Sequence, residues 1–149
     1  MTEALTVLPG VTDLLDEALS HGVPCAVASS SESSWVCGYL DRFEIADRFA
    51  AVVTRDMVPR PKPAPDLYVE ACRRLGAKTD ECVALEDSVN GVTAARAAGL
   101  YCVAVPNPVT TRFALDRAHY IAPSLSEVRL ETIDNLLASE LSKARSSAR

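Results

Sequence analysis

The chain has 149 residues, of which 48% are hydrophobic and 23% charged, a composition typical of one folded globular domain rather than a disordered segment. Its net charge of −5 argues against nucleic acid or an anionic membrane surface as the main partner. No apolar run is long enough to span a bilayer, and the five cysteines form no Cys-x-x-Cys pair. We therefore expect a cytoplasmic protein with free thiols and no membrane partner.

The first part of the chain alternates helical and strand-like segments. Pro9-Gly10 opens a predicted helix whose apolar residues share one face and which ends at Gly22. A short buried strand is predicted over 23–28, and the serine-rich turn Ser29–Ser31 is expected to cap the next helix. A second strand is predicted over 49–54.

The same alternation continues after a proline-rich loop. A helix begins at Asp66 and is stopped by Gly76, and an amphipathic helix is predicted over 128–141. An alanine-rich helix is predicted over 93–98. Three further strands are predicted over 82–85, 101–105 and 119–122. This pattern predicts an α/β protein with a parallel sheet covered by helices on both faces. We expect one domain over 1–141, followed by a frayed C-terminal tail over 142–149.

Polar side chains follow three of the predicted strands, whose carboxyl ends share one edge of the sheet. Ser29 presents a hydroxyl, followed by the amides of Ser30 and its neighbour, that can cradle a phosphate; a capped turn is the alternative. Lys62 is framed by prolines that direct its ammonium toward phosphate oxygens; an exposed loop lysine is the alternative. Glu86 and Asp87 form a hard-oxygen site that suits Mg²⁺; a solvated acidic loop is the alternative.

The chain resembles the haloacid dehalogenase superfamily, and more narrowly its capped phosphatase and β-phosphoglucomutase-like branch. The resemblance is carried by Leu8-Pro9-Gly10-Val11, Val27-Ala28-Ser29-Ser30-Ser31, Lys62-Pro63-Ala64-Pro65-Asp66-Leu67-Tyr68, and Leu85-Glu86-Asp87-Ser88 with Gly91 and Ala97-Ala98-Gly99. It implies a Rossmann-like, three-layer α/β/α core, Mg²⁺ as the cofactor and a small phosphorylated metabolite as the substrate.

The resemblance also implies a role for each candidate residue. Ser29, with Ser30, would hydrogen-bond the phosphoryl group, and Lys62 would offset the charge on the nucleophile and the phosphate. Glu86 and Asp87 would hold Mg²⁺. Members of this superfamily form an aspartyl-phosphate intermediate, which is covalent catalysis by a carboxylate.

Two features of the superfamily are not found in this sequence. The Asp-x-Asp motif that supplies the nucleophile is absent, as is the helical cap, so no residue of this chain is assigned as the nucleophile. The superfamily's first strand lies between the strands that end at Ser29 and Glu86, and its loss would leave an open slot. Ala4–Leu8 is a candidate to fill this slot; a strand from a partner chain or a longer gene product is the alternative. Pro61 also replaces the glycine usual before the lysine.

Three functions are therefore open. The first is a Mg²⁺-dependent phosphatase or phosphomutase by lineage, with the isolated chain expected to be essentially inactive because it lacks a nucleophile. The second is a catalytically dead module that still binds Mg²⁺ and phosphate. The third is an interaction protein whose open sheet pairs with another chain, either in a homo-oligomer or with a strand-donating partner.

Overall fold

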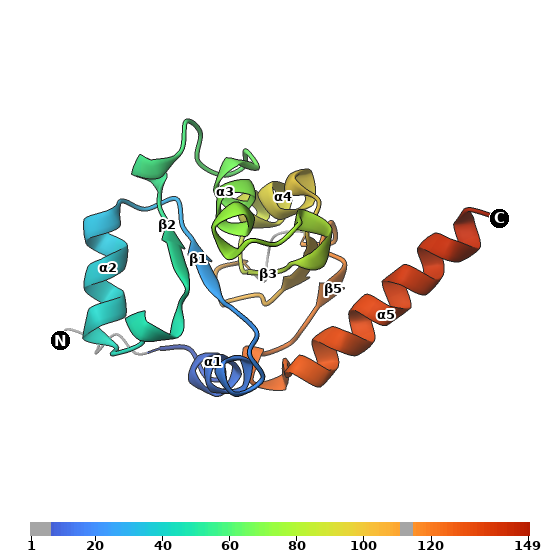
Figure 1. The fold of residues 1–149 in the computed structure, drawn as a ribbon, viewed down its shortest axis with the longest axis horizontal. Helices are drawn as coiled ribbons and strands as arrows, with labels where there is room; N and C mark the ends of the chain where they lie inside the picture. Colours follow the sequence, from blue (N-terminus) through green and yellow to red (C-terminus); the bar gives the residue numbers. More distant parts are fainter. Residues whose placement is uncertain (1–6, 111–114) are drawn as a thin grey trace.

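The computed structural model describes residues 7–110 and 115–149 (Figure 1). The helices of this part of the chain are α1 (Val11–Ser20), α2 (Ser33–Arg42), α3 (Asp66–Leu75), α4 (Val89–Ala98) and α5 (Leu130–Ser147). Its strands are β1 (Ala26–Ala28), β2 (Ala51–Val53), β3 (Val83–Glu86), β4 (Tyr101–Ala104) and β5 (Tyr120–Ile121). Helices and strands alternate from α1 to β4, as the sequence predicts.

Every strand pair is parallel, so the predicted α/β fold is confirmed. The strands form two sheets, β1–β2 and β3–β4–β5. Ala28 of β1 lies opposite Val53 of β2, and Glu86 of β3 lies opposite Ala104 of β4. Within the described ranges, no strand pairs with the second edge of β1 or with the second edge of β3. The sheet is thus divided between the strand that ends at Ala28 and the strand that ends at Glu86.

Helices α1 and α3 connect the two sheets. Leu14 of α1 packs in a cluster with Val103 of β4, whereas the adjacent Leu15 packs in a second cluster alongside Val27 of β1. Helix α3 contacts β1, β2 and α4, and its Tyr68 belongs to the cluster that contains Ala84 of β3. Side-chain packing therefore joins the two sheets into one body without a continuous ladder of backbone hydrogen bonds.

Burial differs between the strands. All four residues of β4 are buried, as expected for a central strand of a parallel sheet covered on both faces. The residues of β1 are only partly buried, and Leu85 of β3 is 38% exposed. Residues of β1 and β3, the two strands at the division between the sheets, are therefore only partly covered, and the terminal strand β5 is exposed as well.

The strand over 23–28 is shorter than predicted, because β1 begins only at Ala26. Pro24 has no backbone N–H to donate to a ladder, which explains why the apolar run does not pair from its start.

The expected capping of α2 by the serine turn Ser29–Ser31 is wrong. The helix begins at Ser33, whose backbone N–H donates to Oδ1 of Asp56 at 3.1 Å. The hydroxyls of Thr54 and Ser33 also donate to this carboxylate, and these hydrogen bonds lower the pKa of Asp56 to about 2. A residue distant in sequence therefore caps the helix, and the serine turn remains at the end of β1.

The C-terminal helix extends past its predicted end at Leu141. Helix α5 continues to Ser147 and extends away from the rest of the molecule, as Figure 1 shows. Residues 142–149 are all exposed. None of the helices described is long and apolar enough to cross a membrane.

The prediction that Ala4–Leu8 fills the open slot rests mostly on residues outside the described ranges. Val7 and Leu8 are described, and neither belongs to a strand. Val7 packs against the cluster of Leu15, Val36, Leu40 and Ile45.

Candidate functional site

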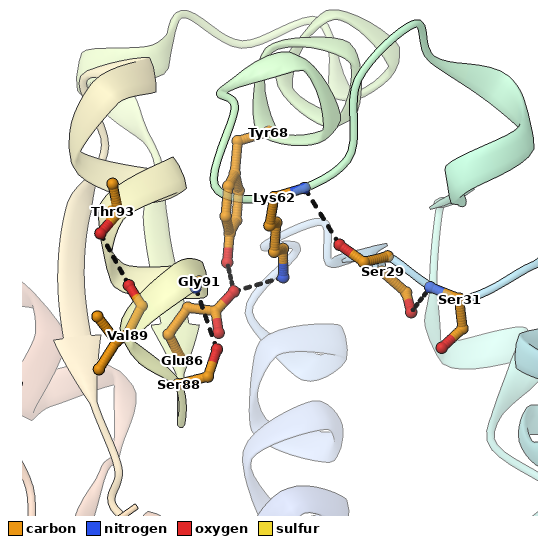
Figure 2. Close-up of polar contacts among 10 residues, drawn as sticks. Ser29, Ser31, Lys62, Tyr68, Glu86, Ser88, Val89, Gly91 and Thr93 are labelled. Atoms are coloured by element: carbon orange, nitrogen blue, oxygen red, sulfur yellow. Dashed lines mark hydrogen bonds and ion pairs between the residues drawn. The ribbon is translucent and has the colours of Figure 1, made fainter. Parts of the chain in front are cut away.

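A pocket of about 330 Å³ lies where β1 and β3 end. It is lined by Ala28, Ser29, Ser30, Lys62, Glu86, Asp87, Ser88 and Asn90. The three polar clusters that follow predicted strands thus meet in one place, as the strand-end argument requires. The serines follow β1, Lys62 lies in the loop before α3, and the acidic pair lies at the end of β3. Hydrogen bonds link these three segments (Figure 2).

The centre of the pocket is an ion pair between Lys62 and Glu86. Nζ of Lys62 lies 2.5 Å from Oε1 of Glu86, and the two side chains are only 14% and 6% exposed. The sequence predicts Glu86 in a loop, but it is the last residue of β3 and is buried. Removing one partner of an ion pair that is shielded from water strongly destabilises the folded protein, because the other charge is left without compensation.

Tyr68 on α3 supports this ion pair in two ways. Its hydroxyl donates to the same Oε1 of Glu86, and Nζ of Lys62 lies 5.0 Å from the centre of its ring (Figure 2). Burial, and then the neighbouring Glu86 carboxylate, raise the pKa of Tyr68 far above its ordinary value. The phenol therefore stays protonated and acts as a hydrogen-bond donor at any physiological pH.

Gly91 in the first turn of α4 leaves room for the Glu86 carboxylate. A Cβ atom at position 91 would overlap both carboxylate oxygens of Glu86. Ser88 caps the same helix, because its hydroxyl accepts a hydrogen bond from the Gly91 N–H at 3.0 Å. The start of α4 is therefore shaped around the buried carboxylate.

The serines at the end of β1 are tied to the lysine loop. The hydroxyl of Ser30 accepts a hydrogen bond from the backbone N–H of Lys62 at 3.2 Å, and the hydroxyl of Ser29 accepts one from the N–H of Ser31 at 3.1 Å. Both serines line the pocket. Their hydroxyl hydrogens are free to turn toward an anion placed there.

Asp87 is the exposed member of the acidic pair. Its Oδ2 accepts a hydrogen bond from the side-chain amide of Asn107 at 2.9 Å. Asn107 was not singled out from the sequence, although its place after a strand and between two prolines was a usable signal. Tyr68 belongs to a segment that carries the family resemblance, but no role was predicted for its hydroxyl.

The side-chain groups of the pocket that could bind a metal fit a hard divalent cation better than a soft one. They are two carboxylates, three serine hydroxyls and an asparagine amide, with no cysteine or histidine among the lining residues. The described residues contain no cluster of three or more His, Cys, Asp or Glu side chains that could hold a metal alone. Mg²⁺ characteristically binds one or two carboxylates and completes its coordination with water and phosphate oxygens. Asp87, with Glu86 adjacent, fits that mode.

Comparison with known proteins identifies the family of this chain. A family model described as haloacid dehalogenase-like hydrolase matches residues 1–99. The chain is 39% identical over 132 residues to "Putative phosphatase YhcW" of Bacillus subtilis, covering 89% of this chain and 60% of that protein. It therefore belongs to the haloacid dehalogenase-like hydrolases.

Solved structures show the same relationship. CbbY from Rhodobacter sphaeroides, solved with phosphate and, as a mutant, with xylulose-(1,5)bisphosphate, matches with a TM-score of 0.77 and 34% identity. The match covers 80% of this chain and 55% of CbbY. A β-phosphoglucomutase from Clostridium difficile shares the fold, with a TM-score of 0.81 at 22% identity. The chain thus spans little more than half the length of these proteins.

Proposed function

We propose that the pocket binds the phosphate group of a small phosphorylated metabolite together with Mg²⁺, as the phosphoryl-binding part of a phosphatase or phosphomutase site. The observation that carries this proposal is the largely covered Lys62 side chain, 14% exposed, at the carboxyl ends of two parallel strands. Two serine hydroxyls lie on one side of it and two carboxylates on the other (Figure 2). The phosphate-bound relative CbbY supports the same ligand class.

Each residue has a distinct part in this proposal. Ser29 and Ser30 donate hydrogen bonds to phosphate oxygens, and Lys62 contributes the positive charge that offsets them. Asp87 holds Mg²⁺ directly, and Glu86 contributes its second oxygen and keeps Lys62 in place. The bound metal supplies further positive charge to the phosphoryl oxygens.

For the isolated chain we propose ligand binding only and no catalysis. The sequence contains no Asp-x-Asp, and the carboxylates of the pocket are already engaged with Lys62, Tyr68 and Asn107. Removal of a nucleophile lowers turnover by several orders of magnitude. We therefore expect phosphate binding without significant hydrolysis.

The test is a titration of the purified chain with inorganic phosphate, with and without Mg²⁺, followed by an assay with 4-nitrophenyl phosphate. We expect Mg²⁺-dependent phosphate binding in the native chain, its loss in Asp87→Ala, and no turnover in either. Absence of phosphate binding would contradict the proposal. Turnover that disappears in Asp87→Ala would show that the chain is an active enzyme and would refute the limit to binding.

The divided sheet favours a second function, the pairing of β1 and β3 with a strand from another polypeptide. The edges of β1 and β3 at the division between the sheets belong to parallel strands, and helices α1 and α3 contact both sheets. The strand that fits would lie parallel to β1 and β3, because it would then pair with their free backbone groups. Its side chains would be apolar on both faces, because it would be buried between helices and would cover Leu85.

Sedimentation equilibrium over a range of chain concentrations tests this pairing between copies of the chain. We expect self-association that Leu85→Lys weakens, because a charge at a free sheet edge opposes strand pairing. The matched control is Leu141→Lys, at an exposed leucine on α5, which should leave association unchanged. A native chain that stays monomeric and unfolds in one cooperative step would rule out pairing with a second copy.

A further inference from the structure

Asn107 lies in the loop after β4, and its side chain has only one orientation that satisfies its hydrogen bonds. Its Oδ1 accepts hydrogen bonds from the backbone N–H groups of Val109 and Thr110, both at 2.9 Å. Its own N–H donates to Oγ1 of Thr110 at 2.9 Å. Since the amide oxygen is committed to two backbone donors, the Nδ2 group must point away from the turn.

Nδ2 of Asn107 points to Asp87. It donates to Oδ2 of Asp87 at 2.9 Å. The two loops are also joined directly, because the N–H of Val105 donates to the carbonyl oxygen of Glu86 at 2.7 Å. The loop that carries Asn107 is thus attached to β3, the strand that precedes Asp87. The Asn107 amide forms a hydrogen bond with one of the two Asp87 carboxylate oxygens. The hydrogen bonds among the described residues leave Oδ1 of Asp87 without a donor.

We propose that Asn107 is a positioning residue of the metal site, which fixes the Asp87 carboxylate so that Oδ1 is presented to the cation. This inference rests on the proposed function, because it takes Asp87 as the direct ligand. The amide is neutral, so it holds the carboxylate without the charge compensation that a lysine or arginine would bring and that would weaken cation binding. Partners of this kind typically change metal affinity by roughly 10- to 100-fold when they are removed.

The competing interpretation is that Asn107 only stabilises its own loop. Thr110→Val separates the two interpretations, because it removes the acceptor for the Asn107 N–H and leaves the bond to Asp87 intact. Asn107→Ala removes both the turn and the contact with Asp87. Asn107→Ser retains an oxygen that can accept a backbone N–H in the turn but is too short to reach Asp87.

The experiment is calorimetric titration of the full chain with Mn²⁺, with thermal unfolding of each variant measured in parallel. We expect Asn107→Ala and Asn107→Ser to lower the Mn²⁺ affinity by roughly 10- to 100-fold, and Thr110→Val to change it little. If Asn107→Ala does not fold, Asn107→Ser decides the question. Equal losses in Asn107→Ser and Thr110→Val, or native affinity in Asn107→Ser, would overturn the proposal.

Failure of the proposed function gives a different result. In that case the native chain itself does not bind Mn²⁺, and the assignment of Asp87 as a ligand is wrong together with the role of Asn107. Native binding that is unaffected by Asn107→Ser overturns only the positioning role.

Discussion

Lys62→Met is expected to destabilise the chain by about 3–5 kcal/mol, because it leaves the buried Glu86 carboxylate without its cation. Methionine fills nearly the same volume, so the loss reflects charge rather than a cavity. The same variant should lose phosphate binding, since among the residues that the structure describes no other lysine or arginine lines the pocket. Urea unfolding measured alongside phosphate titration checks both effects.

Two further variants identify the cause. Adding Glu86→Gln to Lys62→Met removes the unpaired charge but keeps an oxygen that accepts from Tyr68, so most of the lost stability should return while phosphate binding should not. Lys143→Met, at an exposed position of α5, should change stability by less than about 0.5 kcal/mol. If Lys62→Met is as stable as the native chain, the ion pair is not a structural element of this fold.

Gly91→Ala is expected to destabilise the chain by about 1–3 kcal/mol and to weaken phosphate and Mn²⁺ binding, because the added methyl group overlaps the Glu86 carboxylate. The carboxylate can escape only by leaving Lys62 and Tyr68, to which it is hydrogen-bonded. Thermal unfolding and ligand titration of the same preparation measure the two consequences together.

Gly38→Ala is the matched control for this substitution. Gly38 lies inside α2, and a Cβ atom there would meet nothing within 4 Å. Alanine is the better helix former, so Gly38→Ala should stabilise the chain by up to about 1 kcal/mol. If Gly91→Ala behaved in the same way, the close contact between α4 and Glu86 would be wrong.

Helix ends were predictable where a glycine changes the backbone direction. Gly76 and Gly99 end α3 and α4 with positive φ values of 69° and 89°. Gly76 was predicted as a helix stop, and the helix predicted over 93–98 ends directly before Gly99. The gathering of Ser29, Lys62 and Glu86 was also predictable, because loops that follow parallel strands of one layer lie at the same end of that layer. The roles assigned to these residues remain predictions.

The residues that support the site could not be predicted in this way. Tyr68 occupies an apolar position of an amphipathic helix, and periodicity does not show that its hydroxyl meets Glu86. The function of Gly91 depends on how closely α4 approaches β3, and that of Asn107 on the conformation of a loop from another strand. The cap of α2 by Asp56 was missed for the same reason. Each contact is set by tertiary packing.

Lys62 has a double attachment: its backbone N–H bonds to Ser30 beside one sheet, and its side chain bonds to Glu86 of the other. In the proposed function, a phosphate that attracts the Lys62 ammonium competes with the Glu86 carboxylate, which belongs to the other sheet. Tighter binding of a phosphate by Lys62 would therefore weaken the ion pair that links Lys62 to Glu86 of β3. Substitutions that let Lys62 bind phosphate more tightly are thus expected to weaken its contact with Glu86 and so to loosen the packing between the two sheets.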